Sequence, residues 1–182
     1  MILIAGLGNI GNEYENTRHN IGFITIDKIK EDFDFPDWKE KNKYFFSKKK
    51  FNNQDVIIAK PTTFMNLSGE AILAISSLYK IQPQDIIIIH DDLDLKLAQI
   101  KIKQGGGNGG HNGLKSIDKA IGTNYHRIRI GIDHPRNFSP QIDVANYVLG
   151  KFKKEERIEI ERIISNISTH FLDILNKNFK NI

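Results

Sequence analysis

The sequence predicts an α/β fold, a single domain in which a mixed, twisted β-sheet is sandwiched between layers of helices. The apolar run IIII at residues 86–89 is typical of a central strand covered on both faces. Short strand-like segments alternate with amphipathic helical segments, which favours helices packed against a sheet. No internal repeat, low-complexity linker or break in composition divides the 182 residues, so we expect one domain over residues 1–182.

In the first half of the chain, a strand at residues 2–5 runs directly into a glycine turn. Apolar residues at helical spacing from Ile21 then predict a helix that starts near Asn20 and closes near Pro36. Residues 43–60 predict a hairpin, because two asparagines at 52 and 53 supply a turn between two strand-like segments. A second helix begins at Ser68 and is stopped by Pro83.

In the second half, two segments alternate polar and apolar residues as half-exposed strands do, at residues 99–103 and 127–132. One helical pattern lies between these two strands, at residues 112–121, and two more follow the second strand, at residues 141–149 and 154–175. Sites in such folds lie in loops beyond the carboxyl ends of the strands. Four unusually polar loops are expected there, at residues 8–20, 61–68, 90–94 and 105–113.

The composition excludes several classes of protein. Lys and Arg number 26 against 22 Asp and Glu, and this net charge of +4 permits a nucleic-acid partner without arguing for one. The absence of cysteine excludes a disulfide scaffold, a zinc ribbon, an iron–sulfur cluster and a cysteine nucleophile. No apolar run approaches the ~18 residues of a membrane helix, and the apolar start is too short for a signal peptide. We therefore expect a cytoplasmic protein without membrane contact.

The segment GLGNIG at residues 6–11 matches the dinucleotide-binding pattern G-x-G-x-x-G and follows a strand. That site requires a helix beginning at the glycines, and an acidic residue ending the next strand about 20 positions on. Residues 12–20 have no helical apolar period, and Glu31 and Asp32 lie inside a predicted helix. We favour the alternative, in which the glycines permit a tight turn that lets Asn9 face a cleft.

Histidine with carboxylate and amide partners is the chemistry that the polar loops offer. The metal-binding patterns H-x-x-x-H and H-E-x-x-H, the EF-hand pattern and the nucleophile pattern G-x-S-x-G are all absent from the sequence. The dense cluster HDDLD at residues 90–94 has a plain interpretation as turn and cap formation after the central strand. A carboxylate that holds imidazole in one tautomer, however, makes the other ring nitrogen a better base toward water.

Six motifs, taken together and in order, resemble the bacterial peptidyl-tRNA hydrolase family. They are GLGNIG (6–11), YENTRHN (14–20), KPTTFMNLSG (60–69), HDDLD (90–94), GGGNGGHNGLKSI (105–117) and HRIRIG (126–131). The resemblance covers about residues 1–150, and a C-terminal helix is expected within 151–182. Two departures from the family pattern concern loop geometry: Ile10 stands where the family usually has proline, and the loop after Asp94 reads LKLA.

The resemblance implies hydrolysis of the ester that joins a peptide to the 3′ end of tRNA, which releases free tRNA without a cofactor or metal. It implies that His19 is the catalytic base and that Asp91 orients it. On sequence grounds alone, Asp92 is the competing carboxylate. Substrate-binding roles fall on Asn9, Tyr14, Phe64, Asn66 and Asn112, with Met65 and His111 as further cleft residues. The implied partner is peptidyl-tRNA, and the implied oligomeric state is a monomer.

The positive charge is concentrated in one segment. Residues 96–136 hold eight basic and two acidic residues, a net charge of +6 that exceeds that of the whole chain. Lys101 and Lys103 share one strand face by their spacing, as do Arg127 and Arg129. We expect phosphate contacts from these residues, chiefly Lys103 and Arg129, as the family implies.

Three alternatives to the hydrolase are a dinucleotide-binding module, a noncatalytic RNA-binding protein, and a splicing factor related to the family. The first would use residues 6–11 to bind a cofactor. The second would bind tRNA equally well with or without a peptidyl group. The third would have lost the catalytic residues, and the presence of His19 and Asp91 argues against it.

Overall fold

The computed structural model of the chain describes residues 1–182, apart from the side chain of Asn181. Its centre is a mixed sheet of seven strands in the order β2-β3-β4-β1-β5-β7-β6. The strands are β1 (Ile2–Gly6), β2 (Lys39–Lys41), β3 (Tyr44–Phe51), β4 (Gln54–Pro61), β5 (Ile86–Asp92), β6 (Ile100–Gln104) and β7 (His126–Gly131). The four inner strands β4, β1, β5 and β7 are parallel, whereas β2, β3 and β6 run antiparallel to their neighbours.

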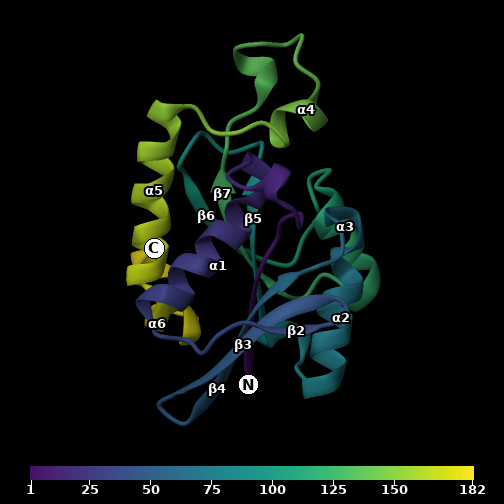
Figure 1. Cartoon of the computed structure of the whole chain (residues 1–182), viewed down its shortest axis with the longest axis vertical. Coiled ribbons are helices and arrows are strands. Elements are labelled where there is room, and N and C mark those ends of the chain that lie inside the picture. Colours follow the sequence, from purple (N-terminus) through teal and green to yellow (C-terminus); the bar gives the residue numbers. More distant parts are fainter.

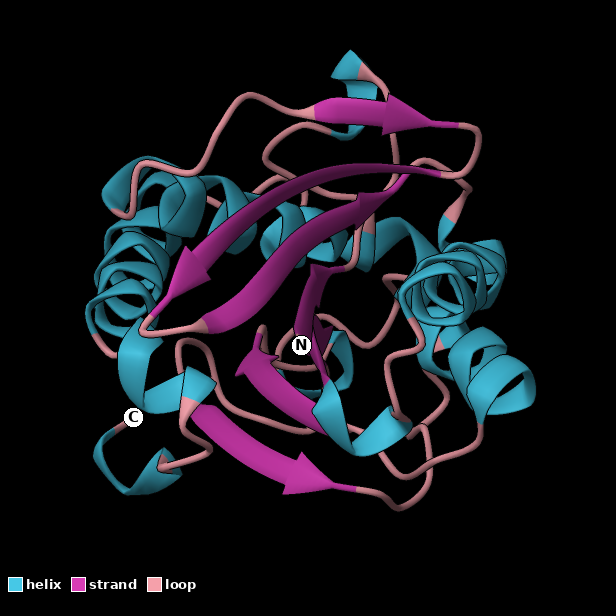
Figure 2. Cartoon of the chain, turned by 90° about the horizontal axis from the view of Figure 1, so that it is seen from below, coloured by secondary structure: helices cyan, strands magenta, loops and turns pink.

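Helices cover both faces of the sheet (Figures 1 and 2). The helices are α1 (Ile21–Asp32), α2 (Ser68–Tyr79), α3 (Asn112–Ile121), α4 (Val144–Val148), α5 (Lys154–Thr169) and α6 (Phe171–Leu175). Figure 1 shows α1, α5 and α6 on one side, α2 and α3 on the other, and α4 beyond one end of the sheet. The predicted α/β sandwich is confirmed.

The central strand β5 contributes to two apolar cores because its alternate side chains point to opposite faces. Ile87 and Ile89 belong to the core beneath α1 and α5, and Ile86 and Ile88 belong to the core beneath α2 and α3. All four side chains are fully buried. This two-sided burial explains why the strand is continuously apolar, as the sequence indicated.

Several predicted elements have the expected bounds. The hairpin forms between β3 and β4, and Asn52 and Asn53 both take positive φ in its turn, at 43° and 66°. The helix expected to start near Asn20 begins at Ile21, and the helix expected from Ser68 begins at that residue. A helix at the glycines of residues 6–11 does not form in the described part of the chain: a short 3-10 turn covers Asn12–Tyr14 instead. The geometry that a dinucleotide pyrophosphate needs is therefore missing.

Other expectations were wrong in detail. The last long helix is interrupted at His170, which separates α5 from α6, and the helix predicted at 141–149 covers only Val144–Val148. The short edge strand β2 was not predicted, because residues 39–41 read KEK and carry no apolar alternation. Strand β7 is almost wholly buried rather than half-exposed, since β6, the glycine loop and the C-terminal segment cover it.

The direction of β6 changes the position of the glycine loop. Because β6 is antiparallel to β7, Gln104 lies opposite His126, at the amino end of the parallel strands. The glycine loop thus leaves the sheet at the end opposite the other polar loops. It then returns toward them, and its residues 107–110 line the same cleft as Asn9, His19 and Asp91, as expected. Arg127 holds the loop against the sheet by donating to the carbonyls of Gly107 (2.7 Å) and Gly106 (2.6 Å). The loop then reaches His111 on the way to α3.

No helix in the described part of the chain is long and apolar enough to cross a membrane.

Candidate active site

The catalytic candidate His19 lies on a 3-10 turn, Arg18–Asn20, directly before α1. Glycine makes this placement possible: a Cβ on Gly22 would collide with the backbones of Leu7, directly after β1, and Ile89 of β5, so the first turn of α1 lies against both. Asn20 then fastens the turn to the loop after β1. Its Oδ1 accepts from the backbone N–H of Asn9 (2.8 Å), and its amide donates to the carbonyl of Asn9 (2.9 Å).

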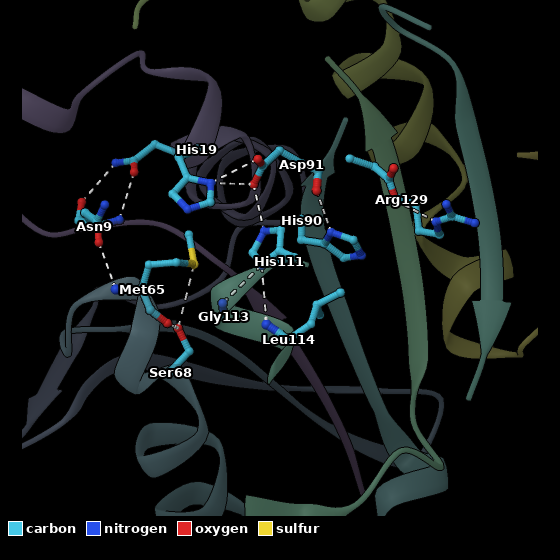
Figure 3. Close-up of polar contacts among 12 residues, drawn as sticks. Asn9, His19, Met65, Ser68, His90, Asp91, His111, Gly113, Leu114 and Arg129 are labelled. Atoms are coloured by element: carbon cyan, nitrogen blue, oxygen red, sulfur yellow. Dashed lines mark hydrogen bonds and ion pairs between the residues drawn. The ribbon is translucent and has the colours of Figure 1, made fainter. Parts of the chain in front are cut away.

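Asp91, near the end of β5, faces the histidine ring. His19 Nδ1 lies 2.9 Å from each carboxylate oxygen of Asp91, as Figure 3 shows. The side chain of Asp91 is 2% exposed and that of His19 is 12% exposed. Among the described residues no hydrogen bond is made to His19 Nε2. This ring nitrogen is therefore available to a molecule in the cleft.

His111 supports the same carboxylate, and its tautomer follows from its contacts. His111 is the N-cap of α3, and its Nδ1 accepts the backbone N–H groups of Gly113 (3.1 Å) and Leu114 (3.3 Å). A nitrogen that accepts cannot carry a proton, so the proton of the neutral ring is on Nε2. His111 Nε2 donates that proton to Asp91 Oδ1 at 2.9 Å. Asp91 consequently receives hydrogen bonds from two imidazoles.

The charge of Asp91 sets the protonation of His19. Burial opposes a charge on His19, but the charge of Asp91 and the hydrogen bond to it together raise the pKa of His19 above its ordinary value. Burial also opposes the charge of Asp91, yet the contacts with His19 and His111 hold the pKa of that carboxyl well below its usual range. Asp91 is thus a fixed anion that stabilises a proton on His19.

Asn9 presents a hydrogen-bond donor to the cleft. Its Oδ1 accepts the backbone N–H of Met65 at 2.8 Å, which identifies the oxygen of the side-chain amide. The Nδ2 group therefore points the other way, with two N–H groups that have no acceptor among the described residues. Asn9 and Met65 are both buried, at 7% and 5% exposed. The two residues form a fixed wall beside His19 (Figure 3).

The remaining predicted substrate residues surround a cleft of about 850 Å³. Phe64, Asn66 and Asn112 line it directly, as do Asn9, His19, Met65 and His111. Phe64 is 54% exposed, so its ring is open to a ligand. Tyr14 is not among the lining residues and reaches the site through Phe64, with the two ring centroids 6.5 Å apart in an edge-to-face arrangement.

The structure separates the two competing carboxylates. Asp91 faces His19, whereas Asp92 accepts from Arg129 Nε at 2.7 Å. Arg129 and Lys103 both line the cleft, and Lys103 makes no ion pair within the described residues. Arg127 is 2% exposed and is occupied by the carbonyls of the glycine loop. Arg127 also lines the cleft, so a phosphate contact from it stays a prediction, but the cover of its guanidinium by the loop makes Arg129 the more accessible of the two.

Sequence reasoning missed His90 and the wall formed by α4. His90 is buried, donates from Nδ1 to the carbonyl of Asp91 (2.6 Å), and packs its ring edge-on against His111. Burial, with the neighbouring His111 adding to it, lowers the pKa of His90 to about 3, so this ring remains neutral. From α4, Val144 and Val148 line the cleft. The short apolar pattern at 141–149 was the available signal, and its place over the cleft depends on tertiary contacts.

His19, Asp91 and His111 also form a geometric candidate for a metal site, since their ligand atoms lie within 4.8 Å of one another. The donor chemistry does not fit. A metal on His111 Nε2 would require that nitrogen to lose its proton, while Nδ1 is held as an acceptor by two backbone N–H groups. The ring would then be an anion, which makes this a poor metal site.

Fold and site together define an α/β protein with a histidine–carboxylate pair in a polar cleft, an arrangement typical of hydrolases that use a general base. The sequence profile of the peptidyl-tRNA hydrolase family matches residues 3–182. A peptidyl-tRNA hydrolase of Rickettsia bellii (strain RML369-C) is 49% identical over 189 residues, covering 99% of this chain and 96% of the relative. One from Rickettsia peacockii (strain Rustic) is 48% identical over 193 residues and covers both chains fully.

Solved structures agree with the sequence relatives. The crystal structure of peptidyl-tRNA hydrolase from Acinetobacter baumannii superposes with a TM-score of 0.90 at 36% identity, covering 97% of this chain and 89% of that one. A Helicobacter pylori nucleosidase, at 11% identity and a TM-score of 0.51, shares the fold alone. The chain belongs to the peptidyl-tRNA hydrolase family, and it is a hydrolase acting on peptidyl-tRNA.

Proposed function

We propose that His19 is the general base that activates water for hydrolysis of the ester between a peptide and the 3′ end of tRNA. The contact of His19 Nδ1 with both oxygens of Asp91 carries this proposal. With Nδ1–H donated to Asp91, Nε2 has the free electron pair that a base needs. The hydrogen bond from His111 holds Asp91 in place as the ring of His19 acquires charge.

In the first step, His19 Nε2 takes a proton from water while the water oxygen attacks the acyl carbon of the ester. The carbonyl oxygen becomes an oxyanion, for which the amide of Asn66 is our proposed donor. In the second step, the bond to the ribose oxygen breaks, and that oxygen receives the proton from the His19 imidazolium. The products are a peptide acid and tRNA with a free 3′-terminal ribose, and the enzyme returns to its starting state.

Asn9 is the proposed discriminator between peptidyl-tRNA and aminoacyl-tRNA. Its oxygen is engaged by the N–H of Met65, so its amide offers donors to the substrate. A peptide carbonyl accepts such a bond, whereas a free α-ammonium only donates and leaves the buried amide unpaired. Leaving a buried donor unpaired costs about 1–3 kcal/mol, which corresponds to a preference of roughly 5- to 150-fold for the N-blocked substrate.

The tRNA part of the substrate is proposed to lie along the basic side of the cleft. Lys103 has no carboxylate partner among the described residues, and Arg129 keeps its terminal nitrogens outside the ion pair with Asp92. Both are suited to phosphates of the acceptor stem. Asn112 and Phe64 are proposed to hold the 3′-terminal nucleotide and the adjoining residue, with Tyr14 supporting Phe64 from behind.

We further propose that the protein acts in the cytoplasm as a monomer. The substrate arises during translation, and each residue of the proposed machinery comes from a single chain. Light scattering after gel filtration tests the oligomeric state: a mass near 20.8 kDa is expected, and a stable dimer would contradict this part of the proposal.

The decisive experiment compares peptide release from N-acetyl-aminoacyl-tRNA and from free aminoacyl-tRNA with the native protein and with His19→Ala. We expect His19→Ala to lose most of the activity and to unfold at nearly the native temperature. A matched control, His170→Ala, removes a histidine at the α5–α6 junction and should keep the native rate. A fully active His19→Ala protein would refute the mechanism.

A further inference from the structure

The turn that carries His19 is also joined to the chain that follows α4. The backbone N–H of Arg18 donates to the carbonyl of Gly150 at 3.0 Å. Beside this bond, Thr17 pairs with Lys151 in an isolated antiparallel bridge. The segment before α1 and the segment between α4 and α5, more than 130 positions apart in sequence, are therefore in direct backbone contact.

The side chain of Arg18 makes this joint specific. It is 5% exposed, and its guanidinium lies over the rings of Tyr147 (4.3 Å) and Phe152 (5.4 Å). Nη2 pairs with Glu156 at 2.8 Å, and Nη1 donates to the carbonyl of Tyr147 at 3.4 Å. One planar cation thus contacts the last turn of α4, the linker after it and the first turn of α5.

Helix α4 is the wall of the cleft that depends on this joint. Val144 and Val148 of α4, and Leu149 directly after it, line the same cleft as His19. Apart from Arg18, Tyr147 anchors the helix through its hydroxyl, which donates to the carbonyl of Ile132 at 2.6 Å. Figure 1 shows α4 beyond the end of the sheet, away from the longer helices that cover its faces.

A merely stabilising side chain at this position has no need of a charge. Buried ion pairs contribute little to stability compared with well-packed apolar residues of similar volume. Arg18 Nε is, in addition, buried without a hydrogen-bond partner among the described residues, which costs stability. The guanidinium does provide a fixed geometry. Its N–H groups lie in one plane and its face is flat, so it fixes the positions of both the Glu156 carboxylate and the Tyr147 ring.

We propose that Arg18 is a positioning residue for substrate binding, which sets the distance between the His19 turn and α4 and so fixes the width of the cleft. Glu156 is its partner in this role. The inference rests on the proposed function in taking the cleft as the substrate site, but it does not depend on which group acts as the base. Loss of the latch formed by Arg18 and Glu156 loosens a wall that the substrate touches before and during the reaction, so it weakens binding more than turnover.

The test measures KM and kcat separately for N-acetyl-aminoacyl-tRNA in Arg18→Gln, Arg18→Lys and Glu156→Gln. We expect Arg18→Gln to raise KM roughly tenfold while kcat falls less than about threefold, because uniform binding is lost. Arg18→Lys should recover only part of this effect, because an ammonium cannot reproduce the fork. Glu156→Gln retains the cap of α5 on the backbone N–H of Lys153 and removes only the charge, so it should raise KM while remaining folded.

Two further measurements separate positioning from folding. Hydrogen exchange of α4 should be faster in Arg18→Gln and Glu156→Gln, whereas the pH at which activity falls on the acid side should stay native. Arg162→Gln is the matched control, because Arg162 pairs with Glu159 on the exposed face of α5 and should leave KM unchanged. Native KM in both latch variants, with only a lower melting temperature, would overturn the proposal. An active His19→Ala protein would instead overturn the proposed base and leave the latch effect on KM measurable.

Discussion

Replacing Asp91 by asparagine tests the centre of the mechanism, because it removes a charge and keeps the shape of the side chain. In the native site, His19 Nδ1 is 2.9 Å from both carboxylate oxygens. A hydrogen bond to a charged group contributes about 1.5–3 kcal/mol. If the contribution is made mainly when His19 becomes imidazolium, its loss lowers the maximal rate by roughly 10- to 150-fold.

The pH dependence of Asp91→Asn has a sign that the structure determines. The base must be neutral, so activity rises as pH increases through the pKa of His19. In the native protein, Asp91 raises that pKa above its ordinary value against the opposing effect of burial. Without the anion, burial remains and lowers the pKa. The acid limb of the kcat/KM profile should therefore move to lower pH while the plateau falls.

The assay is peptide release from N-acetyl-aminoacyl-tRNA across the acid range, corrected for spontaneous ester hydrolysis. Asp92→Asn is the control, since Asp92 contacts Arg129 and not His19, and its acid limb should stay at the native position. An acid limb that stays in place in Asp91→Asn, or that moves only in Asp92→Asn, would show that the wrong carboxylate has been assigned to the base.

Three further predictions follow from the same geometry. Asn9→Asp keeps an oxygen for the Met65 N–H but replaces the amide donor with a negative charge. The rate of N-acetyl-aminoacyl-tRNA hydrolysis relative to that of free aminoacyl-tRNA should therefore fall roughly tenfold. An unchanged ratio in paired assays contradicts the role of Asn9. Lys103→Gln should raise KM and reduce the slope of log KM against log salt concentration by about 1, the value expected for one lost phosphate contact, with hydrolysis of a minimal substrate unaffected. A native salt slope counts against this contact. Dialysis against a chelator should leave activity intact, because His111 Nε2 carries the proton that a metal would displace; activity restored only by added metal would refute this.

Local signals in the sequence were sufficient for most of the secondary structure. The isoleucine run of β5 predicted a strand covered on both faces, because only a strand buried on both sides lacks polar alternation. The asparagines of the β3–β4 turn predicted a hairpin, because asparagine tolerates the positive φ that the turn requires. The edge strand β2 and the break at His170 lack such local signals, since their conformation comes from pairing and packing with distant segments.

In the candidate site, too, some features could be predicted from the sequence and others depended on the fold. The resemblance of the motifs to the peptidyl-tRNA hydrolase family selected His19, Asn9 and Asp91, whereas residue chemistry alone left Asp91 and Asp92 as competing carboxylates. Which carboxylate faces His19 depended on the fold: successive side chains of a strand point to opposite faces, and only the packing of α1 decides which face the histidine shares. His111 became a support of Asp91 only through the N-cap of α3, which fixes its tautomer.

The basic residues show most clearly what the sequence determines and what the tertiary structure determines. Sequence alone concentrated the positive charge at residues 96–136 and placed Arg127 and Arg129 on one face of a strand. Only the tertiary structure distinguished the two. Because β6 runs antiparallel, the glycine loop crosses that face and buries Arg127 under its carbonyls, while Arg129 remains at the cleft beside Asp92. Periodicity specifies the face of a side chain, but what covers that face depends on segments distant in sequence.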